Sequence, residues 1–378
     1  MTPGFSFEVL AQDGAARVGR LFTPRAVIDT PVFMPVGTQA TVKTQSPSEV
    51  EQSGARLILG NTYHLMLRPG AELIDSLGGV QRFMAWPHAL LTDSGGYQVF
   101  SLAKLRKIDD EAVVFRSHID GSSHVLSPER SMQVQGLLGS DIAMVLDECP
   151  PGNADRLAVQ EAVARTTRWA QRSLAAPTRA GQARFGIVQG GSFVDLRLEH
   201  LAEIASMPFD GIALGGFSVG EPMEITYRVL AEVGPKMPPA LPHYLMGVGK
   251  PIDLLRAIAA GIDMFDCVLP TRNARNGQAL TWGGRVNLKQ ARHRQSSEPL
   301  DRRCDCPVCA TYSRAYLHHL VRVGEILGLR LITQHNLHFY QALTRACREA
   351  IRAGRFAEFA AQAEAQMVEQ DEIGPAHP

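Results

Sequence analysis

The sequence predicts an α/β protein in which parallel strands close into a (β/α)8 TIM barrel, with an N-terminal β hairpin and an inserted C-terminal subdomain added to it. Eight short apolar runs recur along the chain, each bounded by Gly, Pro or Asp, and helical patterns separate several of them. Near-continuous apolar runs are typical of strands buried on both faces of a parallel sheet. A doubly wound sheet is the alternative that the same alternation allows.

The elements follow in chain order. The first is a hairpin in FSFEVLAQDGAARVGRLFT, which turns at Asp13-Gly14 and is expected to cover the barrel floor. The eight barrel strands are expected at residues 31–37, 56–61, 89–94, 143–148, 185–190, 211–216, 243–248 and 264–269. Helical patterns occupy residues 154–174, 193–207, 221–233 and 250–261. The whole chain, 1–378, is thus expected to form one barrel domain.

Two insertions are rich in β-forming residues. Residues 112–127 carry Asp120-Gly121 as a turn signal, and residues 277–290 carry Gly283-Gly284. No internal repeat is present in the sequence. These segments are expected to decorate the barrel without interrupting it.

Polar residues cluster where the barrel strands are expected to end. They are Asn61, Asp93, Asp147, Glu148, Gln189, Gly215, Gly216, Gly247 and Asp266. Each Asp or Asn, taken singly, fits a turn or a helix N-cap. Barrel enzymes nevertheless place their active sites at this end of the strands, and three aspartates with a glutamine on one rim predict a catalytic site.

Three cysteines stand within six residues in RRCDCPVC, at Cys304, Cys306 and Cys309. Tetrahedral zinc requires a fourth N or S ligand, and His318, His319, His335 and His338 are candidates. Residues 313–327 are expected to be helical, and the chain can return toward the cysteines after them. An iron-sulfur cluster would normally need a fourth cysteine, which is not nearby. A closed structural zinc site, holding a subdomain of residues 270–340, is therefore expected.

Composition and charge exclude several classes of protein. The chain has 45% hydrophobic and 20% charged residues, which is typical of a globular protein and not of a disordered one. No apolar run reaches the ~18 residues of a membrane span, and MTPGFSFEVL does not resemble a signal peptide. The remaining cysteines are scattered, which argues against a disulfide framework. A cytoplasmic protein with no membrane contact is expected.

The formal net charge is zero, but it is unevenly distributed. Residues 271–303 contain eight Arg or Lys against two acids, a local excess of six positive charges. Basic runs are more often solvated surfaces than binding sites, so this feature alone is a weak indication of a polyanion partner.

Several motifs, in order along nearly the whole chain, resemble those of bacterial tRNA-guanine transglycosylases, also called queuine tRNA-ribosyltransferases. They are LTDSGGYQVFSL, LDECPP, GIVQGG, LGGFSVGE, MGVGKP, FDCVLPTR, and CDCPVC with His335. The resemblance implies a pentosyltransferase of queuosine biosynthesis. Such an enzyme replaces the wobble guanine of G-U-N anticodons in tRNA with 7-aminomethyl-7-deazaguanine. Base exchange with retention at the sugar requires two inversions, for which a nucleophile and an acid/base suffice.

The resemblance also assigns roles to the residues at the rim. It implies that Asp266 is the nucleophile and Asp93 the general acid/base, although the residues alone leave the reverse assignment open. Asp147 is expected to accept hydrogen bonds from the guanine N1-H and amino group. Gln189 and the N-H of Gly216 are expected to donate to O6.

Further residues are expected to shape the base pocket. Tyr97 and Met246 would sandwich the flipped base, as stacking on an aromatic side chain permits. Cys149 and Val219 correspond to the bacterial form of the family and imply the smaller aminomethyl base. Phe217 departs from the aliphatic residue expected there.

RNA and partner contacts are also implied. Arg272, Arg275 and Lys250 are expected to grip the anticodon loop, with one structural Zn²⁺ per chain bound by the three cysteines and His335. Family members act as homodimers, with interface candidates at Tyr312, Tyr316 and His319. Two alternatives remain: a non-catalytic tRNA-binding subunit of the same fold, and an unrelated metal-dependent barrel such as an aldolase. Retention of both acids argues against the first, and the absence of rim histidines argues against the second.

Overall fold

The computed structural model describes residues 2–102 and 106–371. Met1, residues 103–105 and residues 372–378, which belong to the expected domain 1–378, lie outside the described residues. Its central sheet is parallel, in the order β4-β15-β14-β13-β12-β11-β7-β6-β5. The segments are β4 (Val32–Met34), β5 (Val36–Gly37), β6 (Leu57–Gly60), β7 (Ala89–Thr92), β11 (Ile142–Met144), β12 (Ala183–Val188), β13 (Gly211–Leu214), β14 (His243–Leu245) and β15 (Met264–Asp266).

The sheet closes on itself. Its two end segments, β4 and β5, are consecutive in the chain and are separated only by Pro35, whose carbonyl accepts a hydrogen bond from Leu59 N at 3.0 Å. An open doubly wound sheet would instead have two separate edge strands. The predicted α/β barrel is therefore confirmed, with one of its eight strands interrupted by a proline that cannot donate to the ladder.

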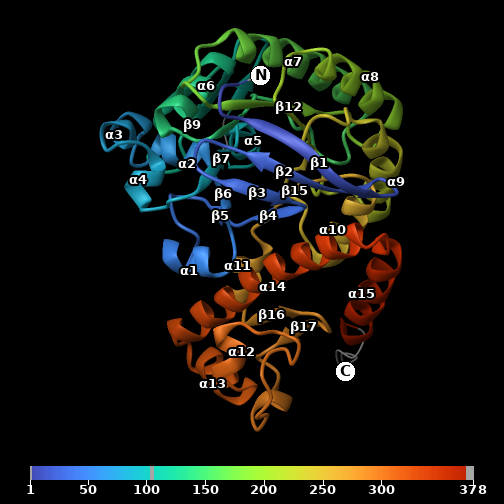
Figure 1. Cartoon of the computed structure of the whole chain (residues 1–378). Coiled ribbons are helices and arrows are strands. Elements are labelled where there is room, and N and C mark those ends of the chain that lie inside the picture. The colour runs from blue at the N-terminus through green and yellow to red at the C-terminus, as the bar shows by residue number, and fades with distance from the viewer. Residues whose placement is uncertain (1, 103–105, 372–378) are drawn as a thin grey trace.

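Helices surround this barrel in Figure 1. Those before β12 are α1 (Pro47–Gln52), α2 (Thr62–Leu67), α3 (Ala71–Ser76), α4 (Val80–Met84), α5 (Gly96–Leu102), α6 (Pro128–Leu138) and α7 (Arg156–Ala175). Between the later strands lie α8 (Val194–Ala205), α9 (Met223–Val233), the 3-10 helix η1 (Gly234–Lys236) and α10 (Pro251–Ala259). The four helices expected from the sequence correspond to α7, α8, α9 and α10, each within two residues of its predicted ends. None of the described helices is long and apolar enough to cross a membrane.

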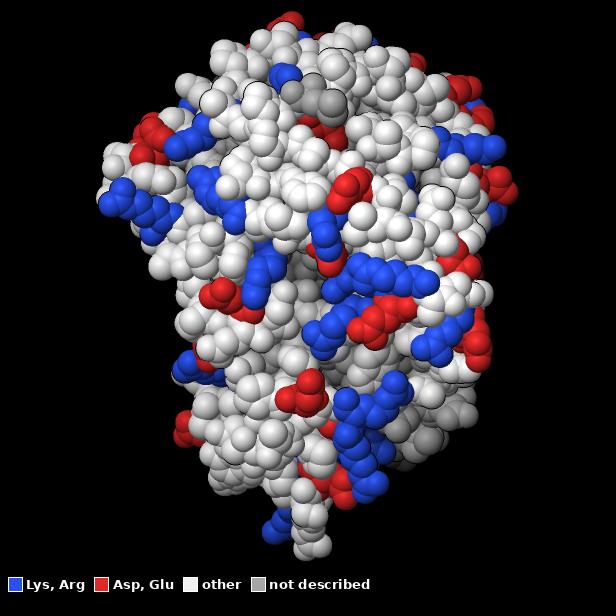
Figure 2. Space-filling model, in the orientation of Figure 1, with Lys and Arg blue, Asp and Glu red and all other residues white. Residues whose placement is uncertain are grey.

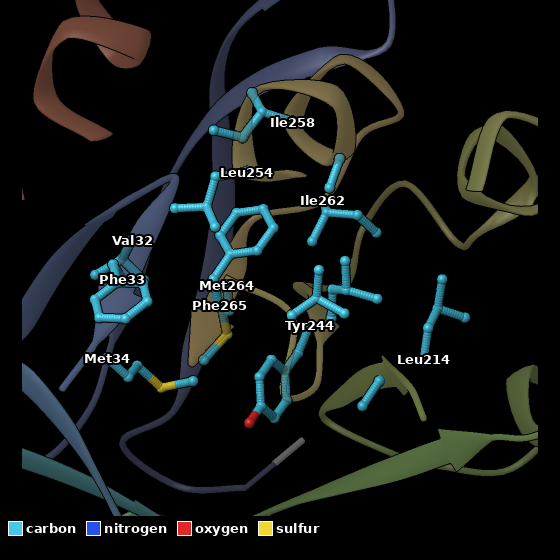
Figure 3. Close-up of a cluster of buried hydrophobic side chains, with 14 of the residues drawn as sticks. Val32, Phe33, Met34, Leu214, Tyr244, Leu254, Ile258, Ile262, Met264 and Phe265 are labelled. Carbon is cyan, nitrogen blue, oxygen red and sulfur yellow. The ribbon is translucent and has the colours of Figure 1, made fainter. Parts of the chain in front are cut away.

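The barrel core is apolar and tightly closed. Figure 3 shows side chains of β4, β14 and β15 packed below Leu254 and Ile258 of α10, with Leu214 of β13 beyond Tyr244. Phe33, Met264 and Phe265 have no exposed surface. The phenol oxygen of Tyr244 is the one polar tip among the residues labelled in this view. The strands are therefore held by burial on both faces, as their apolar sequence predicts.

The amino ends of the strands are covered by a three-stranded antiparallel sheet of β1 (Ser6–Asp13), β2 (Ala16–Phe22) and β3 (Val27–Thr30). Arg17 anchors it through a buried ion pair with Asp263, which directly precedes β15. The predicted hairpin is present, but Asp13 pairs with Ala16, so the turn residues are Gly14 and Ala15 and the predicted turn at Asp13-Gly14 is wrong by one residue. The third strand was not predicted, because Val27–Thr30 is only four residues long and leads straight into β4.

The two predicted insertions are β-structured. The first forms β8 (Arg106–Ile108), β9 (Val113–Arg116) and β10 (Ser123–Leu126), and the second forms β16 (Gln278–Thr281) and β17 (Gly284–Asn287). In the second hairpin Thr281 pairs with Gly284, so the turn residues are Trp282 and Gly283. The predicted turn at Gly283-Gly284 is thus wrong by one residue.

The C-terminal region contains α11 (Leu269–Arg275), the 3-10 helix η2 (Ala291–His293), α12 (Pro307–Thr311), α13 (Arg314–Val323), α14 (Ile326–Arg352) and α15 (Phe356–Asp371). The helix expected over 313–327 ends at Val323, because Gly324 adopts φ +79° and caps it. A separate apolar cluster spans Ala274 to Ile332. Figure 1 shows α14 running between the barrel and this lower lobe. The subdomain boundary at 270–340 stays a prediction.

Candidate active site and metal centre

The carboxyl ends of the parallel strands bring the predicted polar residues to one rim. Asp93 follows β7, Asp266 ends β15, and Gln189 follows β12. Asp147 lies three residues beyond β11, and Gly216 two residues beyond β13. Because neighbouring strands are in parallel register, these residues converge over the barrel mouth.

Asp93 is held by three donors. Thr62 N donates to Oδ1 at 2.8 Å, while the side-chain amides of Asn61 and Gln98 both donate to Oδ2, the latter at 2.9 Å. Only 7% of the residue is exposed. Burial raises the pKa of Asp93 to about 6, against the effect of these hydrogen bonds, and the charge of Asp266 adds to the rise. Such a pKa suits a general acid/base near neutral pH.

Asp266 has a different environment. Its Oδ1 accepts from Tyr244 Oη at 2.6 Å and from Gly247 N at 2.8 Å. Among the described residues no donor contacts Oδ2. Burial raises the pKa of Asp266, and the bonds from Tyr244 and Gly247 oppose that rise. Burial also holds the pKa of Tyr244 well above its usual value, so the phenol remains a donor. One oxygen is thus held by two donors, and the other has none among the described residues.

Asp147 and Gln189, the two residues expected to recognise the base, are hydrogen-bonded to each other: Gln189 Nε2 donates to Asp147 Oδ2 at 2.7 Å. Ser94 Oγ donates to Oδ1 at 3.3 Å. Burial raises the pKa of Asp147 to about 6. Gln189 is 1% exposed, and its Oε1 is buried without a hydrogen-bond partner among the described residues. This edge therefore has both acceptors and a donor that a ligand can engage.

A glycine is required beside this amide. Gly216 adopts φ +70°, and a Cβ there would lie 2.3 Å from Gln189 Oε1. Glu221 folds back over the following turn and accepts from Ser218 N at 2.5 Å and Val219 N at 3.0 Å. The loop after β13 thus brings its main chain close to Gln189.

The remaining predicted pocket residues are less buried. Cys149, Val219 and Met246 are half-buried, and Tyr97 on α5 is 51% exposed. Burial raises the pKa of the Cys149 thiol to about 12, so it is not a thiolate nucleophile at neutral pH. Phe217, where the resemblance predicts a smaller aliphatic residue, is 5% exposed and lies against Arg197.

Glu148 is not part of this constellation. Its carboxylate pairs with Arg165 of α7, and its own N-H donates to Thr166 Oγ1 at 3.1 Å. Of the two adjacent acids after β11, only Asp147 contacts Gln189. Glu148 instead anchors the loop to its helix.

The residues expected to bind RNA lie on the helices after β14 and β15. Lys250 is the exposed N-cap residue of α10, and Arg272 is exposed on α11. Arg275 is half-buried, and its Nη1 has no hydrogen-bond partner among the described residues. On the face in Figure 2, Lys and Arg are interspersed with Asp and Glu, and one group of them lies on the lower lobe. Since α11 begins three residues after Asp266, its cationic side chains follow closely in the chain on the rim that carries Asp266.

Three thiols and an imidazole meet in the lower lobe. The Sγ atoms of Cys304, Cys306 and Cys309 lie 3.7, 3.5 and 3.3 Å from His335 Nδ1. Tetrahedral Zn–S and Zn–N bonds would place these atoms about 3.5 Å apart. Nε2 of the same ring bonds Leu280 O at 2.9 Å, which leaves Nδ1 for a metal. This cluster can hold a metal ion.

Several polar residues at the rim were not singled out from the sequence. Gln98, Thr62 and Asn61 bind Asp93, and Tyr244 binds Asp266. Of these residues, only Asn61 is among the strand ends that the sequence predicts at the rim. The sequence signal for Tyr244 is a phenol in the short strand β14, which pairs with β15. The sequence alone did not indicate which strands would be adjacent.

Comparisons with known proteins identify the family of this chain. A family model described as queuine tRNA-ribosyltransferase matches residues 12–369. The queuine tRNA-ribosyltransferase of Sorangium cellulosum is 61% identical over 95% of this chain and 91% of its own length. That of Dinoroseobacter shibae is 55% identical over 98% and 99%, and that of Zymomonas mobilis 53% over 95% and 94%. The chain therefore belongs to the queuine tRNA-ribosyltransferase family, and it is an enzyme of that family.

Proposed function

We propose that this protein exchanges the wobble guanine of tRNAs with G-U-N anticodons for 7-aminomethyl-7-deazaguanine, in queuosine biosynthesis. The single observation that carries the proposal is the contrast between two carboxylates at one rim. Asp93 has both oxygens bound by donors, whereas Asp266 has one oxygen without a donor among the described residues. One acid is arranged to manage a proton and the other to attack.

The reaction proceeds in two displacements. Oδ2 of Asp266 attacks C1′ of the ribose as the C1′–N9 bond breaks, and the departing guanine takes a proton from Asp93. The incoming base then returns a proton to Asp93, and its N9 attacks C1′ and displaces Asp266. Two inversions give retention at the sugar carbon. Tyr244 and Gly247 hold Oδ1 throughout and stabilise the carboxylate when it leaves.

Base recognition uses groups that satisfy one another in the free protein. Asp147 would accept from the base N1-H and amino group, and Gln189 Nε2 would turn from Asp147 to O6. Gly216 N-H supplies the second donor to O6. Tyr97 and Met246 would stack on the two faces of the extruded ring. Cys149 and Val219 limit the space beside the seven-position, which favours a small aminomethyl group.

The RNA would be positioned by charge and the base by the pocket. Arg272, Arg275 and Lys250 adjoin the rim and would contact phosphates of the anticodon loop, which makes binding salt-dependent. We assign Zn²⁺ to the Cys304, Cys306, Cys309 and His335 cluster, because three thiolates and one imidazole are a closed tetrahedral set. The ion's contribution is to hold the lobe together.

A homodimer is proposed on the same lobe. Tyr312, the C-cap residue of α12, stacks on Tyr316 of α13 with ring centroids 5.5 Å apart, and Tyr316 and His319 are exposed. Exposed aromatic residues are enriched in protein interfaces. The partner subunit would extend the basic surface available to tRNA.

Trapping the intermediate tests the function. The protein is incubated with an unmodified tRNA carrying a G-U-N anticodon and 9-deazaguanine, and a denaturing gel is used to detect a covalent protein-RNA band. The wild-type protein and Glu148→Gln should both give the band, because Glu148 lies at the same rim but pairs with Arg165. Asp266→Asn should give none, and its exchange of labelled guanine should fall by about 10³-fold or more. Exchange by Asp266→Asn at the wild-type rate would overturn the nucleophile assignment.

A further inference from the structure

Arg197 is a buried cation that the exchange reaction described above does not use. It lies on α8 with none of its surface exposed. Its guanidinium bonds only main-chain carbonyls: Nε to Gly191 O at 2.7 Å, Nη1 to Gly215 O at 2.9 Å and to Val188 O at 3.4 Å, and Nη2 to Gly216 O at 3.4 Å. No carboxylate of the described residues forms an ion pair with it. A buried charge without a counter-ion is unusual enough to need a reason.

The carbonyl bound most closely by Nη1 belongs to the peptide unit that carries the Gly216 N-H. In a planar trans peptide the C=O and N-H point in opposite directions. The N-H therefore points away from Arg197 and toward Cys149. Burial raises the pKa of the Cys149 thiol, and the hydrogen bond from Gly216 N-H opposes that rise. Consecutive hydrogen bonds polarise one another, so a cation on the Gly215 carbonyl makes Gly216 N-H a stronger donor.

Phe217 keeps this arrangement dry. Its ring lies 3.8 Å from Arg197 Cζ, and 5% of the residue is exposed. The ring covers a face of the guanidinium and adds a cation–π contact. In a water-excluded setting the charge acts on the peptide with little screening. Phe217 therefore shields the Arg197 guanidinium as well as lining the pocket wall.

We propose that Arg197 is a positioning residue for base exchange, which orients and polarises the Gly215–Gly216 peptide so that Gly216 N-H stabilises the negative charge developing on O6 of the departing purine. This inference rests on the proposed function. As the C1′–N9 bond breaks, its electron pair moves into the purine and is shared with O6. A preorganised donor aimed at that oxygen favours the transition state over the ground state.

Two synthetic anticodon stem-loop RNAs, with guanosine or 6-thioguanosine at the wobble position, distinguish this role from simple packing. Base release is measured in single turnover for the wild-type protein, Arg197→Met, Arg197→Lys and Phe217→Leu. Removing one donor in comparable sites reduces turnover about 10²–10³-fold, so loss of its polarising cation in Arg197→Met should slow guanine release by roughly 10 to 100-fold. With 6-thioguanosine the loss should shrink to about 3-fold or less, because sulfur accepts hydrogen bonds weakly.

Arg197→Lys should retain part of the rate, and Phe217→Leu should show a smaller loss with the same preference for the oxygen substrate. RNA affinity should stay within about 3-fold in all variants, because the phosphate contacts lie on other helices. Equal losses on both RNAs would show a structural role and overturn the inference, while leaving the proposed function intact. If the wild-type protein released neither base, the proposed function would fail and this inference with it. If Arg197→Met does not fold, Arg197→Lys and Phe217→Leu make the same comparison.

Discussion

The metal-binding cluster and the barrel rim both gather titratable side chains, but they differ in how completely those groups are satisfied. In the cluster, four ligand atoms lie within 4.8 Å of one another, and the second nitrogen of His335 is bound by Leu280 O. At the rim, Asp266 Oδ2 and Gln189 Oε1 have no partner among the described residues. A site whose polar atoms all have partners within the protein contributes to stability. A site whose polar atoms lack partners in the free protein can bind a substrate.

Removing one metal ligand should have the largest effect. Cys306→Ala should lose the bound metal, which in small zinc domains contributes about 10–16 kcal/mol to folding. The lobe around the cluster should then unfold at a lower temperature than the barrel. Metal content per chain and calorimetry measure this, with the buried but non-ligating Cys347→Ala as the control. A Cys306→Ala protein with unchanged metal would remove the distinction between the two regions.

Replacing the acid/base at the rim should affect chemistry and leave the metal in place. Asp93→Asn should slow guanine release about 10²–10⁴-fold, because no side chain then protonates the leaving base. In the wild-type protein the protonated fraction of Asp93 falls as pH rises through about 6, so single-turnover release should decline there. Release measured across pH 4 to 9 should lose this descending limb in Asp93→Asn. A limb that persists would assign the proton to another group.

Asp147→Asn should lose guanine binding and raise the free energy of unfolding. The folded-state pKa of Asp147 is raised from 3.8 to about 6, so its carboxyl favours folding below the unfolded pKa and loses that benefit as pH rises through about 6. A neutral Asn avoids burying this charge, and Gln189 can present its free Oε1 to the new amide. The variant should therefore be more stable than wild type by about 1–3 kcal/mol at pH 8, with no gain near pH 3.

Denaturant unfolding at the two pH values measures that difference, and guanine binding should be lost in the same variant. A stability gain that is equal at both pH values would show that the effect does not come from ionisation of Asp147. The contrast between rim and cluster would then need another physical basis.

The smallest expected effect concerns phosphate contacts outside both centres. Arg272→Ala should weaken tRNA binding several-fold and reduce the slope of log affinity against log salt by about 1. Arg302→Ala is a matched control, since Arg302 belongs to the same basic segment but pairs with Glu298. Titrations at several salt concentrations measure both. Equal slopes for the two variants would place the RNA elsewhere.

Much of the fold was accessible from the sequence. The apolar runs and the helical segments between them predicted the barrel, because strands buried on both faces are apolar along nearly their whole length. The cysteine spacing likewise indicated the metal cluster. The interrupted first strand, the third strand of the floor sheet and the 27-residue α14 were missed, because each depends on long-range packing more than on local pattern.

The residues by themselves determined which acids stand at strand ends, and the motifs determined the family. Only the tertiary structure decided how those acids differ, because hydrogen-bond donors reach them from strands and loops distant in sequence. Asn61 and Gln98 bind Asp93, while Tyr244 leaves Asp266 with a free oxygen. The proposed role of Arg197 at the Gly215–Gly216 peptide could not be predicted from the sequence either, because it depends on main-chain carbonyls that only the fold brings to the guanidinium.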